Sequence, residues 1–496
     1  MEDFKPFFTN PFASPIDAIP LLSEDLFWDK VILAVNEEQF RVLSLFSASL
    51  KQTWQIWIVL GNDATGLIKV GRFRVVDNAY TSRTELLSCI HLFEREIYEQ
   101  SGILPRNHPW LKPVRSPHQS ACSQMDFYSI EGEDIHEVAV GPVHAGIIEP
   151  GHFRFQCYGE KVGHLEISLG YQHRGVEKAL LGMPKANHLK QVEALCGDST
   201  TAHSTCYAQN MEALTGIKIS EKEALIRAIL LELERIANHV GDIGALSGDV
   251  AFLTTASYCG KLRGNILNLT AQITGNRFGR GGICIGGTRY DIDYALAQTL
   301  KTQLKALQPK IMGAIELFFR SPSVLDRLEK TGIIPQEWVM AYGFTGLVAK
   351  ASNCLRDVRT SYPYGSYIDR DLKTSLEKSG DVFARAKVRK EEILICFELV
   401  QTLLKELEMI AHVQIQKQQN TALPAEYFSF SMSEGWRGGV AHTIITDDKG
   451  DIQRYKVVDP SFFNWTALSL AMRDGQISDF PLCNKSFNLS YCGFDL

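Results

Sequence analysis

The stretch "SEKEALIRAILLELERIANHV", Ser220–Val240, decides the fold. It opens with a capping-box pattern, because Ser220 precedes Glu223 by three residues, and this pattern is typical of a helix N-terminus. A single apolar stripe at helical spacing then follows. Its members are Ile226, Ile229, Leu230, Leu233, Ile236, Ala237 and Val240. A long helix with one apolar face buries that face against other helices, so the stretch predicts a helical bundle.

Further helices are expected on both sides of this one. Glu391 to about Val413 places four apolar residues in line: Leu399, Leu403, Leu407 and Ile410. Residues 200–215, 252–274 and 291–320 also favour helix, and short β-like runs occupy about 138–169. The second part of the chain is therefore expected to be mainly helical, with small β elements at its edges.

The beginning of the chain has a different pattern. "FRVLSLFSAS" and "WQIWIVL" are rich in aromatic and β-branched residues, which is typical of strands, and "LIKVGRFRVV" partly alternates. A helix is expected over residues 82–101, and Gly102 marks its end. Its expected apolar face contains Leu86, Ile90, Phe93 and Ile97.

Four prolines mark the end of this first part: Pro105, Pro109, Pro113 and Pro117. Proline fixes φ and removes a hydrogen-bond donor, so the segment is neither helix nor central strand. We expect an α+β protein with a small α+β domain at 1–118, a linker at 119–136, and a mainly helical bundle domain with short β elements at 137–496.

Composition limits the possible functions. The chain has 496 residues, 45% of them apolar and 22% charged, with a net charge of −6. The acidic balance argues against a nucleic-acid partner, which needs a concentrated basic surface. No apolar run of about 18 residues predicts a membrane span, and the N-terminus has no secretory-signal pattern. The 11 scattered cysteines indicate reduced thiols in a cytoplasmic compartment.

A possible metal-binding turn is incomplete. "EALCGDSTTAH", Glu193–His203, has Cys196 but Ser199 where a second thiol of a C-x-x-C pair would stand. "VVDPSFFNW" near the C-terminus has Ser461 and Asn464 at the same spacing. Thiolate sites need several soft ligands, so the alternatives are a degenerate site and a buried free cysteine at a helix start. Without any C-x-x-C pair, an iron–sulfur cluster held by this chain is not expected.

Several motifs, in order along nearly the whole chain, resemble one family. They are "FEREIYEQSGILPRNHPWL" (93–111), "GPVHAGIIEPGHFRF" (141–155), "LGYQHRGVEKAL" (169–180), "ELERIANHVGDIGALSGDVAF" (232–252), "CLRDVRTSYPYGSY" (354–367) and "EGWRGGVAHTI" (434–444). The chain resembles the large subunit of group 4 NiFe hydrogenases and, equally, the fused 30-kDa and 49-kDa subunits of respiratory complex I. The resemblance assigns the first domain to the 30-kDa subunit and the second to the 49-kDa subunit.

The resemblance gives the incomplete turn a meaning. Hydrogenases of this family hold nickel with two C-x-x-C pairs, whose positions here are Cys196, Ser199, Ser461 and Asn464. One thiol of four predicts no nickel–iron centre and no metal. Complex I places a quinone headgroup in the vacated cavity, and its headgroup tyrosine aligns with Gly197 here. Tyr171 or Tyr207 is then expected to substitute in space, so a quinone is an allowed ligand.

The resemblance also implies roles for charged residues, each of which has a simpler explanation as loop or solvated surface. His144 and Glu149 are expected to border the cavity and to exchange protons. His173, Arg174 and Glu177 are expected in a buried charged chain, with Glu177 at pairing distance from either neighbour on a helix. The expected proton path contains Arg235, His239, Asp242 and Asp249, joined by Asp357 and Arg359.

Two functions of different classes remain open, and the resemblance favours an enzyme subunit. In the first, a peripheral large subunit of a complex I-like oxidoreductase couples electron transfer, with quinone as an allowed acceptor, to ion translocation without nickel–iron. In the second, it is a non-redox structural or coupling subunit; an active hydrogenase is a distant third. The implied partners are an iron–sulfur small subunit, which carries the cluster, and antiporter-like membrane subunits, at the cytoplasmic face of the cell membrane.

Overall fold

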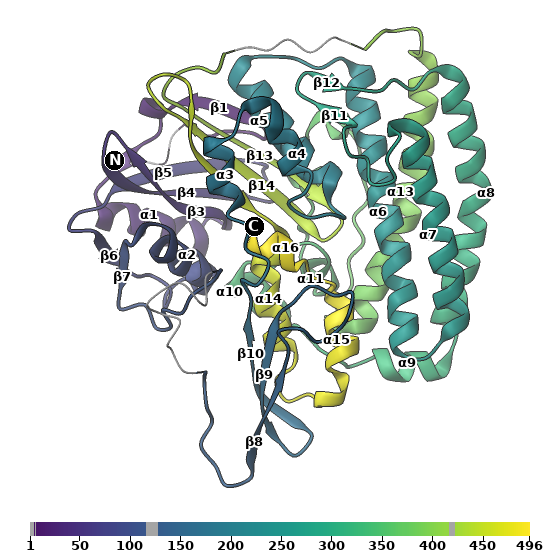
Figure 1. The fold of residues 1–496 in the computed structure, drawn as a ribbon, viewed down its shortest axis with the longest axis horizontal. Helices are drawn as coiled ribbons and strands as arrows, with labels where there is room; N and C mark the ends of the chain where they lie inside the picture. Colours follow the sequence, from purple (N-terminus) through teal and green to yellow (C-terminus); the bar gives the residue numbers. More distant parts are fainter. Residues whose placement is uncertain (1–3, 5, 116–126, 416–421) are drawn as a thin grey trace.

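The computed structural model describes residues 4, 6–115, 127–415 and 422–496. The expected α+β fold is confirmed: helices stand together as a bundle on one side, and sheets occupy the other (Figure 1). The expected linker falls partly on residues 119–126, which lie outside the described residues. Residues 127–134 form neither helix nor strand.

The N-terminal part is built on a four-stranded sheet in the order β2-β5-β4-β3. Its strands are β2 (Leu21–Leu22), β3 (Phe40–Leu50), β4 (Thr53–Asn62) and β5 (Ile68–Arg74), joined by helices α1 (Glu24–Asn36) and α2 (His91–Ser101) and the pair β6 (Ala79–Thr81) and β7 (Leu104–Arg106). The strands predicted from "FRVLSLFSAS" and "WQIWIVL" are therefore confirmed as β3 and β4.

The helix predicted over 82–101 is too long, because α2 begins only at His91. Glu94 explains the late start: its carboxylate accepts hydrogen bonds from the backbone N–H of Arg83 and the hydroxyl of Thr84, which fixes the start of the turn at residues 84–86. Leu86 is 63% exposed and does not belong to the apolar face. Gly102 does end the helix, in the left-handed conformation at φ 70°.

A second four-stranded sheet combines distant parts of the chain. Its order is β1-β13-β14-β15, all antiparallel, and its strands are β1 (Phe12–Pro15), β13 (Tyr427–Gly435), β14 (Gly438–Thr446) and β15 (Ile452–Val458). The register pairs Phe12 with Phe430. An N-terminal strand is thus an edge of a C-terminal sheet, which the sequence pattern did not predict. The division at residue 118 stays a prediction.

The helical bundle contains α6 (Glu221–Asp249), α7 (Leu253–Thr274), α8 (Tyr294–Phe319) and α13 (Val382–Met409), which run side by side (Figure 1). The capping box that was predicted at Ser220 is present, and the apolar stripe of α6 is buried. The helix predicted from Glu391 begins nine residues earlier, because Asp381 caps α13 through the backbone N–H of Ala384.

Shorter elements position the region between the bundle and the sheets. A three-stranded sheet of β8 (Ile135–Val140), β9 (His152–Tyr158) and β10 (Lys161–Ser168) extends away from the body (Figure 1). The segment 275–287, which is rich in glycine, leads into the hairpin of β11 (Ile283–Cys284) and β12 (Gly287–Thr288). The remaining α-helices are α3 (Val176–Gly182), α4 (Lys185–Val192), α5 (Thr200–Thr215), α9 (Pro322–Leu328), α10 (Gln336–Tyr342), α11 (Leu347–Ala351), α12 (Val358–Ser361), α14 (Pro460–Ala471), α15 (Phe480–Phe487) and α16 (Tyr491–Asp495). Within the described residues, no helix is long and apolar enough to cross a membrane.

Candidate functional site

Cys196 lies in the turn between α4 and α5. Its side chain is 1% exposed, and its sulfur is 3.1 Å from Ser490 Oγ and 3.1 Å from Asp198 Oδ1. Ser490 caps α16, so the turn meets the C-terminal end of the chain here. Arg437 Nη1 lies 3.4 Å from the same sulfur. The thiol is therefore enclosed by polar and charged groups rather than by apolar side chains.

Arg437 and Asp198 form a bidentate ion pair next to Cys196, with N–O distances of 2.6 and 2.9 Å. The carbonyl oxygen of Asp198 accepts hydrogen bonds from Asn238 Nδ2 and Trp436 Nε1, both at 2.9 Å. Burial opposes ionisation of the Asp198 carboxyl, but the Arg437 guanidinium overcomes this and lowers its pKa. The pair is charged and fixed at one wall of the site.

The other three positions of the incomplete metal site make structural contacts. Ser199 precedes α5, and its backbone N–H donates to the carbonyl of Cys196 at 3.0 Å. Ser461 Oγ accepts from the backbone N–H of Ser490 at 3.0 Å. Asn464 holds Thr345 through both its amide oxygen and its amide nitrogen, each at 3.1 Å from the Thr345 backbone.

These donors do not fit a nickel–iron group. Cys196 supplies one soft ligand, whereas a hydroxyl and an amide are hard, weakly basic donors. Both hydrogen-bonding atoms of the Asn464 amide already serve the chain itself. Among the described residues, no cluster of three histidine, cysteine or acidic side chains is arranged to hold a metal ion. The absence of nickel stays a prediction.

The loop from Gly141 to Gly151 meets this site at α16. His144 Nε2 is 3.4 Å from the hydroxyl of Tyr491, and Glu149 acts electrostatically on the thiol of Cys492. Cys492 in turn shares the hydroxyl of Ser490 with Cys196, at 3.3 and 3.1 Å. Burial lowers the pKa of His144. The loop that carries His144 and Glu149 therefore meets α16 next to the Cys196 turn, and their role at a cavity stays a prediction.

The tyrosines that were expected to replace the aligned headgroup tyrosine lie elsewhere. Tyr207 is buried between the rings of His188 and Tyr455. Tyr171 lines a separate cavity of about 680 Å³, together with Trp465. Tyr491 is the tyrosine that adjoins Cys492.

His173 and Arg174 attach their segment to the end of the chain. His173 Nδ1 is 2.7 Å from the carbonyl oxygen of Asp495, and Arg174 donates to the carbonyl oxygens of Ala194 and Leu195, just before Cys196. Arg174 is therefore a positioning group for the turn, and His173 is one for the C-terminal helix α16.

Glu177 does not pair with either of its two neighbours along the helix. It is buried and accepts hydrogen bonds from Lys456 at 3.1 Å and Arg454 at 3.1 Å, because β15 packs against α3. Burial opposes its ionisation, but Lys456 and Arg454 lower its pKa. Burial also lowers the pKa of Lys456 to about 7, although Glu177 opposes this shift. Lys456 further contacts Glu96 at 2.6 Å, which joins the N-terminal part to this cluster.

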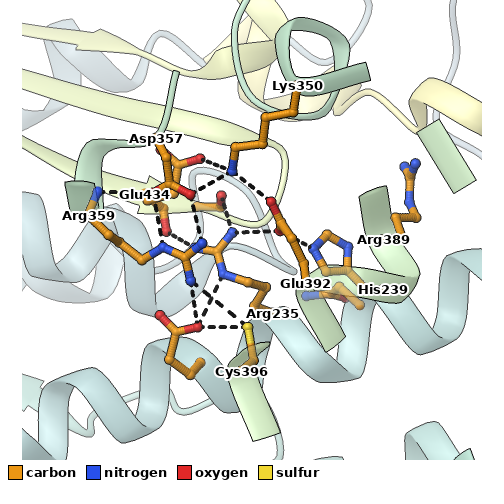
Figure 2. A network of polar contacts seen from close by, with 12 residues as sticks. Arg235, His239, Lys350, Asp357, Arg359, Arg389, Glu392, Cys396 and Glu434 are labelled. Atoms are coloured by element: carbon orange, nitrogen blue, oxygen red, sulfur yellow. Dashed lines mark hydrogen bonds and ion pairs between the residues drawn. The ribbon is translucent and has the colours of Figure 1, made fainter. Parts of the chain in front are cut away.

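A network of buried charges lies between α6, α13 and β13 (Figure 2). Arg359 bridges Asp357 at 2.7 Å and Glu232 at 2.9 Å. Arg235 donates to the carbonyls of Glu434 and Gly435, which fixes the turn that carries Arg437. Arg235, His239, Asp357 and Arg359, which the family resemblance selected, are thus brought together.

Glu392 and Lys350 complete this network, and neither was predicted as a site residue from the sequence. Glu392 accepts from His239 Nε2 at 2.7 Å and from Lys350 Nζ at 2.7 Å. Lys350 also reaches Asp357 at 2.7 Å and Glu434 at 3.3 Å. Burial raises the pKa of Glu434 to about 7, and the negative charge of Asp357 adds to the shift. Glu434 is therefore the acid in this network whose protonation changes near neutral pH.

Asp242 connects the bundle to the Cys196 region. It accepts from Arg389 Nε at 2.9 Å and from the side-chain amide of Asn488, whose carbonyl accepts from Arg437. Asp249 does not join it: its side chain is exposed at the end of α6, and no hydrogen bond or ion pair links it to another described residue. Of these two residues, Asp242 therefore joins the buried contacts and Asp249 does not, and the proton path itself stays a prediction.

A buried chain of three polar rings and one carboxylate was not predicted from the sequence. Contacts of 2.8, 3.0 and 3.2 Å link, in this order, Tyr455, His442, His203 and Asp459. Asp459 caps α14 just before Ser461. The sequence did contain a signal for His442 and Asp459, because they lie in the quoted stretches "VAHTI" and "VVDPS". Neither was selected as a site residue, because each is the only such polar residue in its stretch.

Comparisons with known proteins agree with these observations. Residues 249–495 match the family model described as respiratory-chain NADH dehydrogenase, 49 Kd subunit. The carbon monoxide-induced hydrogenase of Rhodospirillum rubrum is 28% identical over 352 residues, which are 71% of this chain and 96% of that protein. The C/D component of the NADH-quinone oxidoreductase of Phocaeicola vulgatus is 28% identical over 348 residues, 63% of this chain and 67% of that protein.

A solved structure shares the fold. It is a chain of an archaeal respiratory membrane complex, the membrane-bound sulfane sulfur reductase, with a TM-score of 0.68 and 23% sequence identity. The match covers 74% of this chain and all of that one. The resemblance found in the sequence motifs is therefore confirmed.

Proposed function

We propose that this chain transfers electrons without a nickel–iron centre. The premise is that it belongs to the family of complex I 49-kDa subunits and related hydrogenase large subunits. The homologues indicate a large subunit of a complex I-like or hydrogenase-related membrane complex. Within such a complex, it receives electrons at the Cys196 region and passes them to an organic acceptor, while the complex moves ions.

One observation carries this proposal: Cys196 is the only thiol at the four ligand positions, and Asn464 uses its amide to bind the backbone of Thr345. Even with the neighbouring Cys492 thiol, a metal with four thiolate ligands would need two new soft donors and the loss of these bonds. Arg437 also places a positive charge 3.4 Å from the Cys196 sulfur. Its pairing with Asp198, which lies 3.1 Å from the same sulfur, balances this charge within the site.

A quinone fits this region as the acceptor. Tyr491 and His144, which lie 3.4 Å apart, offer a hydroxyl and an imidazole as hydrogen-bonding groups for a carbonyl oxygen. Glu149 adjoins Cys492 in the same place, so a carboxyl group is available for proton transfer. Tyr491 and His144 would then take the role of the headgroup tyrosine, whose aligned position here is Gly197.

The partners of this function are an iron–sulfur small subunit that delivers the electrons and antiporter-like membrane subunits that move the ions. The chain then lies at the cytoplasmic face of the cell membrane as a peripheral subunit. The buried network around Glu434 and Lys350 supports coupling, because its charge changes near neutral pH.

Nickel analysis of the membrane-extracted complex tests the first half of the proposal. We expect far less than one nickel per chain by inductively coupled plasma mass spectrometry. Nickel in a one-to-one ratio would overturn the ligand argument and restore hydrogen chemistry.

Quinone reduction tests the second half. The complex, reduced with dithionite, is mixed with a short-chain quinone, and reoxidation is followed optically. We expect Tyr491→Phe and His144→Ala each to lower the rate at least about tenfold, since removing one hydrogen bond to a charged intermediate costs about 1.5–3 kcal/mol. Tyr258→Phe, at a 56% exposed tyrosine on α7, is the control.

A second function is favoured by one observation, the glycine at position 197. If both variants reduce quinone as fast as the unaltered complex, or if the complex reduces no quinone, the non-redox coupling subunit is the better description. In that case the buried charges move protons or transmit a conformational change, and the Arg437–Asp198 pair is a structural replacement for the lost metal.

A further inference from the structure

The C-terminal helix brings a second thiol to Cys196. Cys492 lies on α16, and its sulfur is 3.3 Å from Ser490 Oγ, which is itself 3.1 Å from the Cys196 sulfur. The hydroxyl of Ser490 is therefore in contact with both sulfurs. They are separated by almost 300 positions in sequence, so only the folded chain pairs them.

The two thiols differ in access. Cys196 is 1% exposed, whereas Cys492 is partly exposed. An accessible thiol beside a buried one is the usual arrangement of a reactive dithiol, in which the first attacks and the second resolves.

Charged groups around the pair suit proton and electron transfer. The carboxyl of Glu149 lies near Cys492, where it can accept the thiol proton. The carboxylate of Asp198 accepts the hydrogen bond of the Cys196 thiol at 3.1 Å. Arg437, at 3.4 Å, stabilises negative charge on Cys196 when that thiol reacts.

We propose that Cys196 and Cys492 form a redox-active dithiol that reduces a small organic disulfide by thiol–disulfide exchange. The Cys492 thiolate attacks one sulfur of the external disulfide, and the other sulfur leaves as a thiolate. The Cys196 sulfur then attacks Cys492, which releases the second external thiol and leaves a Cys196–Cys492 disulfide. Two protons pass to the two departing thiolates, so two protein thiols and one disulfide give one protein disulfide and two thiols. This reaction uses neither nickel nor quinone, but it needs the Cys196 thiol free of metal and so rests on the first half of the function proposed above, which the nickel analysis tests separately.

The test uses the full-length chain in its membrane-extracted complex, with glutathione disulfide as the probe. After exposure, free thiols are blocked with iodoacetamide and the peptides are analysed by mass spectrometry without reduction. We expect a peptide pair cross-linked through Cys196 and Cys492, formed at least about tenfold faster than oxidation of Cys284, a partly exposed control thiol on β11.

Single variants separate the two roles. In Cys196→Ser, we expect Cys492 to keep one glutathione as an unresolved mixed disulfide, and in Cys492→Ser we expect Cys196 to stay reduced. A mixed disulfide that persists at Cys492 in the unaltered chain would overturn the proposal, as would oxidation of Cys284 at the same rate. Should a variant fail to fold, the cross-link and rate ratio in the unaltered chain decide alone.

Discussion

His239 and Glu392 approach each other to 2.7 Å between Nε2 and Oε2, deep between α6 and α13. Both side chains are buried, and the second carboxylate oxygen of Glu392 binds Lys350 at 2.7 Å. One carboxylate therefore joins the two central helices to α11. Buried charges are tolerated only when they are paired and hydrogen-bonded, so the contacts of Glu392 depend on one another.

Removing the Glu392 carboxylate is expected to destabilise the chain strongly. Glu392→Ala leaves Lys350 and His239 without this partner in the core, and breaking a buried pair in this way costs about 3–5 kcal/mol. Glu392→Gln keeps an acceptor oxygen and is expected to cost less. Urea unfolding of the complex, followed by tryptophan fluorescence, measures both.

Glu398→Ala is the matched control, because Glu398 lies on the same helix with an exposed side chain. It is expected to change the unfolding midpoint only slightly, as surface substitutions usually do. Equal midpoints for the Glu392 and Glu398 variants would contradict the central role of this carboxylate.

Glu434 is expected to make stability depend on pH. Its folded pKa of about 7 exceeds that of an unfolded glutamate, so protonation favours the folded state. Its contribution is complete below about pH 4.3 and is lost as the pH rises through about 7. Glu434→Gln cannot ionise, so the gain in melting temperature over the unaltered chain should grow between pH 5 and pH 8. Thermal scans of both proteins across this range measure the difference, and a constant difference would argue against the shifted pKa.

Asn464 tests whether a former ligand position now has a structural role. Asn464→Ala removes the partners of both the backbone N–H and the carbonyl of Thr345, which are buried. An unsatisfied buried polar group costs about 1–3 kcal/mol, so we expect a loss of that order or larger. The metal content of the complex should not change. A loss of bound metal without a loss of stability would identify Asn464 as a ligand instead.

Local sequence patterns predicted the elements of this fold better than their assembly. The capping box at Ser220 and the glycine at 102 both specify helix ends through the backbone, and both are confirmed. The pairing of β1 with β13 joins Phe12 to Phe430, and no local pattern encodes a partner 418 residues away. The late start of α2 depends on the Glu94 side chain, which competes with the helix for the preceding backbone.

The candidate site shows the same limit. Arg235 and His239 were identified because they stand in a motif that resembles a family, but Lys350 and Cys492 lie in stretches with no such signal. Their roles arise from position: Lys350 meets three carboxylates, and Cys492 meets Cys196. Glu177 was expected to pair within its helix, yet the packing of β15 offered Lys456 and Arg454 instead.

The Asp198–Arg437 pair is expected to act as a unit beside Cys196. Arg437→Lys loses the two-pronged contact with Asp198, because an ammonium cannot match the paired oxygens of a carboxylate as a guanidinium does. Asp198→Asn leaves the Arg437 charge buried without its anion. Asp198→Asn is expected to cost about 3 kcal/mol, at the low end for a broken buried pair, because the Asp198 side chain is 33% exposed. Arg437→Lys keeps the charge and is expected to cost less.

The double variant separates an interacting pair from two independent residues. If the ion pair holds the turn, the combined loss in stability should fall short of the sum of the single losses by about 0.5–3 kcal/mol, measured by urea unfolding. Losses that simply add would show that each residue contributes through its other contacts: Asp198 through Asn238, and Arg437 through Asn488. The turn that carries Cys196 would then be fixed by the backbone of Asp198, and the charge beside the thiol would be free to serve a ligand.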